Sequence, residues 1–272
     1  MPKFRLMIAY DGAAFHGWQI QPTVRTVEGD LTRAAERLLG MGRGEVKVQG
    51  ASRTDAGVHA LGQVAHLVFS QDRSPWDLVR GLNGLTEDDV TVVRAEPVDD
   101  TFHARHDARG KIYHYRIWAH RFVNPHARRR AWHVRARLDL ARVREAAALL
   151  VGVHDFAAFR ASDCQSETTV RELWRVDVHE EGDGLRIEVE GTAFLKYMVR
   201  IIAGTLVDVG RGHIEVADVA RALEGGDRKD IGQTAPPHGL TLVKVHYPSW
   251  PWSAPEPRIG GAWLADEADE EG

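Results

Sequence analysis

The chain has 272 residues, 43% of them hydrophobic, which is long enough for two domains that each bury a core. Its single cysteine, Cys164, excludes an intramolecular disulfide and a zinc site built on several thiolates. The first residues lack the apolar stretch of a signal peptide, and no later stretch reaches the length of a membrane span. We therefore expect a cytoplasmic protein without membrane segments.

The charges are unevenly distributed. Residues 266–272, DEADEEG, hold five acids, so removing them from a net charge of −4 leaves about +1. Between Arg105 and Arg137 there are ten Lys or Arg residues and one acid. This basic stretch also contains aromatic residues, which are Tyr113, Tyr115, Trp118 and Trp132. Such a mixture can hold phosphates and stack bases, but a solvated basic face explains it equally well.

The first half of the chain predicts the order β-α-β-β-α-β. Alternating apolar residues predict strands at 4–10, 45–48, 63–69 and 90–98. One helix is expected to begin after Thr26, an N-cap residue, and to end at Gly40. A second begins at Ser74 and Pro75. This order is typical of a ferredoxin-like fold.

The second half repeats that order. It predicts a strand at 111–119, a helix at 138–152, a hairpin of strands at 169–181 and 185–191, an apolar helix at 194–210, a short helix at 216–225 and a strand at 240–247. We therefore predict an α+β protein with two ferredoxin-like halves and mainly antiparallel sheets. The predicted domains are residues 1–104 and 105–247, followed by a disordered tail at 248–272.

The stretch ASRTDAGVHA, residues 51–60, joins two predicted strands through a loop longer than a tight hairpin needs. Asp55 and Gly57 suit an ordinary turn, but long loops on rigid scaffolds often carry function. A second anomaly is Arg200, which lies in the apolar stretch FLKYMVRIIAGTL. A guanidinium near a core needs an anion or water, so Arg200 either extends to the helix edge or pairs with Asp55.

Seven segments resemble, in order, motifs of the tRNA pseudouridine synthase A family. RTDAGVHA at 53–60 is similar to the catalytic loop, and YDGAAFHGWQIQ at 10–21 to the N-terminal motif. FHAR at 102–105 and KIYHY at 111–115 match the segments around the active-site tyrosine. The series is completed by GVHDFAAF at 152–159, FLKYMVR at 194–200 and APPHGLTLVKVHY at 235–247. The resemblance runs from about Phe4 to Tyr247.

This resemblance implies that the chain isomerises uridine to pseudouridine at positions 38, 39 and 40 of the tRNA anticodon stem and loop. It implies a homodimer that grips tRNA across both subunits and needs neither cofactor nor metal. Asp55 would be the catalytic aspartate, Tyr113 would pack against the target uracil, and Arg200 would hold the Asp55 carboxylate.

The remaining expected residues contact substrate or RNA. Arg53 would help to flip the target nucleotide out, Leu240 would form an apolar wall of the pocket, and Arg105 would contact the substrate. RNA contacts are expected from the basic stretch, at Lys111, Arg128, Arg129 and Arg130.

Three residues depart from the family pattern. Ser52 stands where glycine is usual before Arg-Thr-Asp, Tyr197 where histidine is usual, and Ile201 where asparagine often follows the arginine. These departures bear on the surroundings of the site and on tRNA preference. Every residue assigned to the chemistry is retained.

The residues suit the reaction, which breaks the bond from N1 to C1′ and rejoins uracil through C5 without redox change. An ionised Asp55 could attack the sugar or act as base in an elimination through a glycal, and the sequence leaves both routes open. Burial would raise the pKa of Asp55, and a nearby Arg200 would oppose that rise. Tyr113 could take the C5 proton directly or through water, or could be a core aromatic, because alternation places it on one face with Tyr115.

Two other functions compete with this interpretation. A noncatalytic RNA-binding protein would have the same fold and basic loops, but it would leave Asp55 and Arg200 unexplained. A hydrolytic nucleoside glycosidase ordinarily needs a second group to activate water, and the loop supplies only Asp55. No metal is expected, because the spacing of His103, His114 and His154 lacks a metal-site pattern.

Overall fold

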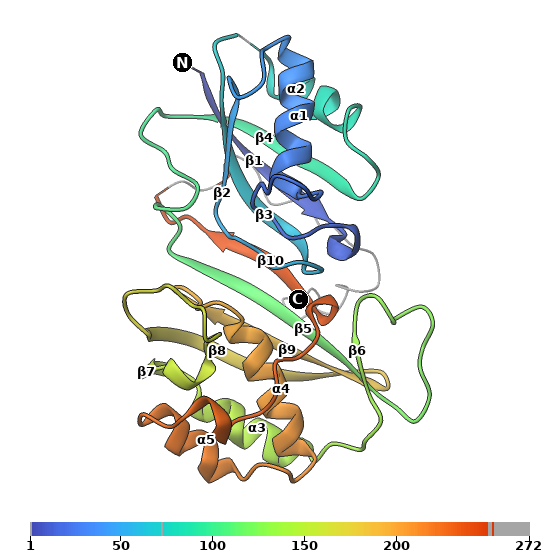
Figure 1. The fold of residues 1–272 in the computed structure, drawn as a ribbon, viewed down its shortest axis with the longest axis vertical. Helices are drawn as coiled ribbons and strands as arrows, with labels where there is room; N and C mark the ends of the chain where they lie inside the picture. The colour runs from blue at the N-terminus through green and yellow to red at the C-terminus, as the bar shows by residue number, and fades with distance from the viewer. Residues whose placement is uncertain (1, 72, 250–251, 253–272) are drawn as a thin grey trace, which may run out of the picture. The chain divides into compact units, whose positions relative to one another are not determined.

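The computed structural model describes residues 2–71, 73–249 and 252, and the chain divides into two compact units (Figure 1). Of the described residues, unit 1 comprises 2–54, 59–71, 73–108, 247–249 and 252. Unit 2 comprises Asp55–Val58 and Arg109–His246. Most of the predicted tail, residues 250–251 and 253–272, lies outside the described residues.

Unit 1 contains the predicted order of strands and helices. The elements are β1 (Lys3–Tyr10), η1 (Gly12–Ala14), α1 (Val27–Leu39), β2 (Lys47–Gly50), β3 (His59–Val68), α2 (Pro75–Asn83) and β4 (Val90–Val98). The strands lie in the order β4-β1-β3-β2, and each neighbouring pair is antiparallel. This is the ferredoxin-like arrangement, so the predicted fold is confirmed for this unit.

The two helices of unit 1 start and stop where local chemistry dictates. The hydroxyl of Thr26 accepts a hydrogen bond from the Gly29 amide, and Gly40 ends α1 with a φ of 61°. Ser74 caps α2 through the Asp77 amide, and Pro75 occupies the first helical position. Both helices bury an apolar face, which in α1 consists of Val27, Leu31, Ala34, Ala35 and Leu39 together with Gly29.

Unit 2 repeats the arrangement with additions. Its elements are β5 (Gly110–Ala119), β6 (Trp132–Val134), α3 (Leu140–Leu149), β7 (Gly152–Asp155), η2 (Ala157–Phe159), β8 (Val170–Glu181), β9 (Gly184–Gly191), α4 (Met198–Gly210), α5 (Val216–Leu223), η3 (Arg228–Asp230), η4 (Pro237–Gly239) and β10 (Leu240–His246). The strand order is β10-β5-β9-β8-β7, and β6 pairs in parallel with β5. The first four strands therefore reproduce the ferredoxin-like order of unit 1.

The structure corrects the prediction for unit 2 in two places. The helix expected at 194–210 begins only at Met198, because Tyr197 has a φ of 64°, which no helix accommodates. The sequence does not predict the short strands β6 and β7, since three or four residues are too few for a period to emerge.

The described part of the chain lacks two kinds of structural feature. None of its helices is long and apolar enough to cross a membrane. The same residues contain no group of three or more His, Cys, Asp or Glu side chains that could hold a metal ion.

Candidate functional site

The turn that carries Asp55 packs with unit 2, whereas the chain on both sides of it belongs to unit 1. The turn is closed by a hydrogen bond from the Val58 amide to the Asp55 carbonyl, at 3.1 Å. Gly57 has a φ of 79°, and a Cβ there would lie 3.1 Å from Cγ of Pro237. Glycine thus provides both the left-handed backbone and the space that this turn requires.

Arg200 forms an ion pair with Asp55. Its Nη1 lies 3.5 Å from Oδ2 of Asp55, and the two side chains are 13% and 26% exposed. Its Nε donates a hydrogen bond of 2.8 Å to the carbonyl of Ala235, whose amide in turn donates to the Arg200 carbonyl at 3.1 Å. The guanidinium is therefore fixed by the backbone while one edge faces the carboxylate.

The segment that holds Arg200 approaches α4 closely at one glycine. A Cβ on Gly204 would lie 1.8 Å from the carbonyl oxygen of Gln233. The Gly232 amide donates to the hydroxyl of Thr205, which fixes the same segment at its other end. Glycine at 204 is consequently what allows Ala235 to reach Arg200.

An aromatic ring also packs against Arg200. The guanidinium carbon of Arg200 lies 4.5 Å from the centre of the Tyr197 ring, a cation–π geometry. Tyr197 is the residue with positive φ that precedes α4, and it is one of the three departures from the family pattern. Here it supplies a ring against which the Arg200 guanidinium packs.

The electrostatics of Asp55 combine opposing effects. Burial raises the pKa of the Asp55 carboxyl above its usual value, and Asp163 adds to that rise. The charge and hydrogen bond of Arg200 and the charge of Lys196 lower it. Without these cations the Asp55 carboxyl would be harder to ionise.

Tyr113 is buried on β5, and its ring meets the Phe194 ring edge-on with centroids 5.1 Å apart. In the register between β5 and β10, Tyr113 lies opposite Leu242, and Tyr115 opposite Leu240. Leu240 is 6% exposed at the start of β10. The structure thus brings Tyr113 and Leu240 onto neighbouring strands of unit 2.

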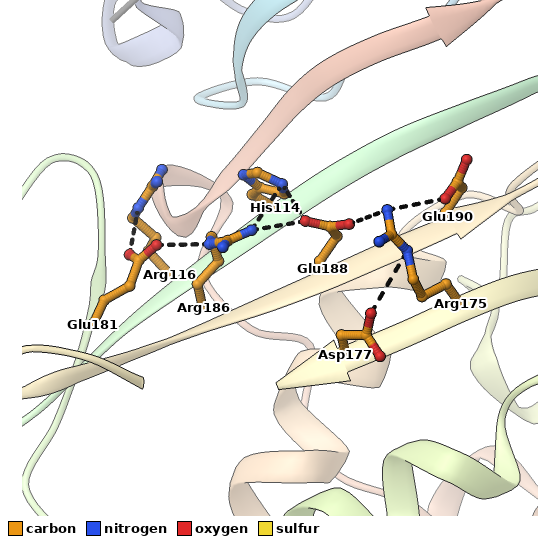
Figure 2. A network of polar contacts seen from close by, with 8 residues as sticks. All are labelled: His114, Arg116, Arg175, Asp177, Glu181, Arg186, Glu188 and Glu190. Carbon is orange, nitrogen blue, oxygen red and sulfur yellow. Dashed lines mark hydrogen bonds and ion pairs between the residues drawn. The ribbon is translucent and has the colours of Figure 1, made fainter. Parts of the chain in front are cut away.

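The opposite face of β5 carries a network of charges (Figure 2). Its members come from β5, β8 and β9, and they are His114, Arg116, Arg175, Asp177, Glu181, Arg186, Glu188 and Glu190. Nε2 of His114 lies 2.9 Å from Oε2 of Glu188, and Nη1 of Arg186 donates to the same oxygen at 2.7 Å. Because His114 follows Tyr113 directly, this network ties the tyrosine's strand to β9.

Glu188 is the most enclosed carboxylate of this network, with 2% of its side chain exposed. Burial alone would raise its pKa, but the hydrogen bond to His114 and the charges of His114, Arg175 and Arg186 lower it to about 2. Burial lowers the pKa of His114 in spite of its bond to Glu188. The network therefore holds an ionised carboxylate among arginines.

The remaining predicted residues divide between the two units. Arg53 and Arg105 are exposed and belong to unit 1. Lys111 is half-buried at the start of β5, and Arg128 to Arg130 are exposed in unit 2. The three arginines lie on a turn in which the Ala131 amide donates to the Ala127 carbonyl, at 2.9 Å.

Sequence reasoning missed the groups that support the site through the backbone. The carbonyl of Ala235 and the close approach at Gly204 have no signature, because any residue offers a carbonyl and glycines are frequent. Phe194, which packs on Tyr113, was assigned to a helix that begins four residues later. The hydropathy pattern does not reveal either contact.

The chain is similar to known proteins over most of its length. A family model described as tRNA pseudouridine synthase matches residues 6–107 and 146–248. A tRNA pseudouridine synthase A from Geobacter sp. (strain M21) is 46% identical over 251 residues, covering 91% of this chain and all of the relative. One from Myxococcus xanthus is 45% identical over 268 residues, covering 98% and 99% of the two chains.

A solved structure is also similar, but too distantly to carry weight. A chain in the "Crystal Structure of a Cbf5-Nop10-Gar1 Complex" is 12% identical, with a TM-score of 0.32. The match covers 88% of this chain and 57% of that one.

Proposed function

We propose that Asp55 is the catalytic carboxylate of this chain, which belongs to the tRNA pseudouridine synthase A family and isomerises uridine in tRNA. The proposed targets are positions 38, 39 and 40 in the anticodon arm. The observation that carries the assignment of Asp55 is its ion pair with Arg200, at 3.5 Å in a half-buried site. A half-buried guanidinium fixed by a backbone carbonyl presents a charge that favours the ionised form of a carboxylate.

Asp55 acts on the sugar of the flipped-out uridine. The bond from N1 to C1′ breaks, the uracil turns, and C5 takes the place of N1 on C1′. Asp55 either attacks C1′ as a nucleophile or removes a sugar proton to form a glycal. Arg200 serves both routes in the same way, because each begins from the carboxylate.

Tyr113 supports the uracil and is the proposed base for the C5 proton, directly or through one water. Its ring offers a stacking surface that offsets the cost of extruding the base, about a few kcal/mol. Leu240 forms an apolar wall beside it. Arg53 and Arg105 contact the substrate, and Arg53 helps to flip the nucleotide.

RNA binding beyond the active site relies on the basic stretch. The half-buried Lys111 and the exposed Arg128 to Arg130 contact phosphates, because cations supply most of the affinity for a polyanion. The family resemblance supports a homodimer in which one tRNA touches both subunits, and a tRNA substrate fits a cytoplasmic enzyme. Light scattering with and without tRNA tests the dimer.

The test of the reaction is tritium release from tRNA labelled at C5 of uracil, followed by mapping of the modified positions. The wild-type chain should release tritium and form pseudouridine in the anticodon arm. Asp55→Ala should release none yet bind tRNA within about tenfold of wild type, since phosphate contacts dominate affinity.

Three other results would contradict the proposal. Activity retained by Asp55→Ala would remove Asp55 from the chemistry. Tight tRNA binding by the wild-type chain without tritium release would indicate a noncatalytic RNA-binding protein. Free uracil as the product would indicate a glycosidase.

A further inference from the structure

The basic stretch that follows Tyr113 folds around a cavity that the proposed reaction does not use. The cavity has a volume of about 260 Å³ and lies between the end of β5, the turn after it and β6. Its lining includes three aromatic or imidazole rings from these strands, Trp118, Trp132 and His133, and a fourth from η4, His238. Drug-sized ligands occupy pockets of about 300 to 1,000 Å³, so this cavity suits a single small ring system.

Two of the rings are held in place by hydrogen bonds to one turn. The indole of Trp118 donates to the Phe122 carbonyl at 2.9 Å. Nε2 of His133 lies 2.9 Å from the His120 carbonyl and donates to it. Rings fixed before a ligand arrives lose little freedom when it binds.

The cavity shares a wall with the catalytic site. The Trp132 ring meets the Tyr115 ring edge-on, with centroids 6.4 Å apart, and the Tyr115 hydroxyl donates to the Pro236 carbonyl at 2.7 Å. Pro236 directly follows Ala235, whose carbonyl holds Arg200. A group in the cavity is thus separated from Arg200 by one short segment, residues 235–238.

His238 supplies a polar group to this shared wall. Burial, together with the nearby charge of Arg200, lowers the pKa of the His238 imidazole, while a bond to the Ala131 backbone opposes that shift. The bond to Ala131 uses the donor nitrogen of the neutral imidazole, so the other nitrogen is an acceptor, which can take a hydrogen bond from an N–H group on the edge of a nucleobase.

A second hollow continues from the same turn and is basic. It has a volume of about 720 Å³, and its lining includes Arg121, Arg135 and Arg137, whereas none of the described residues that line it is acidic. All three arginines are exposed. Cations gathered in a groove hold the backbone of a nucleic acid strand, whereas aromatic rings take its bases.

We infer that the cavity beside β6 is a subsite for a second nucleobase, unpaired and close to the target uridine on the same tRNA strand, whose phosphates follow the arginine-lined hollow. The inference rests on the proposed function, because it requires a tRNA strand that continues from the uridine at Asp55. A base in this subsite would contact residues 235–238 and so fix the position of the RNA strand relative to Arg200.

The test is a double-mutant cycle between RNA and protein. Each unpaired nucleotide of an anticodon stem-loop RNA is replaced in turn by an abasic one, and its Kd is measured with the inactive Asp55→Ala chain. The second substitution in the protein is Trp118→Leu, which removes a stacking surface, or Ala131→Leu, which fills the cavity. Ala131→Leu keeps the test valid if Trp118→Leu disturbs folding.

One abasic position should weaken binding by about 5- to 100-fold. Either cavity substitution should weaken binding of the intact RNA to the same degree and abolish the sensitivity to that position. Trp118→Phe should restore most of the affinity. Trp76→Leu is the matched control, because Trp76 is 69% exposed on α2 of unit 1, and it should keep the full abasic sensitivity.

If the abasic and cavity substitutions had additive effects on binding at every RNA position, the proposed subsite would be wrong. The proposed function is read separately, as pseudouridine formation by the wild-type chain on the intact RNA. Pseudouridine formed without any coupling to the cavity rejects the subsite alone. Absence of pseudouridine rejects the proposed function and, with it, the strand path on which the subsite depends.

Discussion

Unit 1 and unit 2 have the same strand order, but they differ at the start of the second helix of each fold. In unit 1, α2 begins with a capping serine, Ser74, and a proline at its first position. In unit 2, α4 begins after Tyr197, which has positive φ and caps nothing with its side chain. The irregular start is the one that presents Arg200 to Asp55. Equivalent topology therefore does not distinguish the proposed site from its counterpart in unit 1, whereas a local departure from regular geometry does.

The first strands of the two units carry the substitution with the largest expected effect. Tyr113 lies on β5 and Tyr10 on β1, and both are buried. Tyr113→Phe should lower kcat by about 10²- to 10⁴-fold, because the ring remains but the hydroxyl proposed to accept the C5 proton is removed. Single-turnover rates and tRNA affinity separate this effect from binding, which should be unchanged.

Tyr10→Phe is the control, since its hydroxyl bonds to Thr54 at 2.7 Å within unit 1. It should change kcat far less. Equal losses in the two variants would mean that the tyrosines support structure in both units and that Tyr113 is not the base.

The two second helices offer the next test. Arg200→Met should lower kcat by about 10²- to 10³-fold, the cost typical of removing one preorganised electrostatic partner. Because Arg200 lowers the pKa of the Asp55 carboxyl, the acidic limb of the pH–rate profile should also move to higher pH. Profiles of kcat against pH measure both effects.

Arg80→Met, on the exposed side of α2 in unit 1, is the matched control. It should leave rate and profile unchanged. If Arg200→Met weakened tRNA binding and left the pH limb in place, Arg200 would be a phosphate contact and its proposed role would be wrong.

The regular parts of both units could be predicted from sequence, and the irregular parts could not. Thr26, Gly40, Ser74 and Pro75 mark helix ends by chemistry that acts within a few residues, so α1 and α2 were found. The start of α4 depends on the backbone of Tyr197, and hydropathy continues unchanged across it. Pairing of Asp55 with Arg200 was foreseeable because a guanidinium near a core needs an anion.

The supports of that pair could not be foreseen. The Ala235 carbonyl and the close approach at Gly204 arise from chain segments that meet only in the folded unit. The composition of the sequence reveals the basic stretch. Its division into an aromatic cavity and an arginine-lined hollow depends on the pairing of β6 with β5, which the composition does not show.

The two units also differ in their buried charges. Substitution of Glu188 tests how much the charge network of unit 2 contributes to stability. Glu188→Gln should lower the free energy of unfolding at pH 7 by about 3 kcal/mol, because it deprives the buried Arg186 of a carboxylate partner. The lowered pKa, about 2, means that this stabilisation is present above the ordinary value of 4.5 and is lost as pH falls toward 2. Denaturant titrations at several pH values should show wild type and variant converging in acid.

The corresponding change in unit 1 is Glu96→Gln, which removes a carboxylate bonded to Arg5 at 2.7 Å. That variant controls for the removal of a buried ion pair outside unit 2, and it should leave the acid response of the Glu188 network intact. If the loss of unfolding free energy in Glu188→Gln stayed constant down to pH 2, it would contradict the lowered pKa of Glu188.

The smallest expected effect concerns the exposed arginines of unit 2. Replacing Arg128, Arg129 and Arg130 with glutamine should weaken tRNA binding about tenfold near physiological salt. The slope of log K against log salt should fall by about 0.7 to 0.9 for each phosphate that the variant no longer neutralises. The same number of exposed cations in unit 1, Arg37, Arg43 and Lys47, provides the control and should leave the slope unchanged.

Arg128 also lines the cavity beside β6, so the triple variant mixes two effects. A double variant at Arg129 and Arg130 isolates the phosphate contacts. It should lower the salt slope while keeping the abasic sensitivity that the cavity confers, because stacking of a base depends little on salt whereas counterion release depends on it strongly. An unchanged slope in the double variant would remove this turn from the RNA surface and leave Arg128 as a residue of the cavity alone.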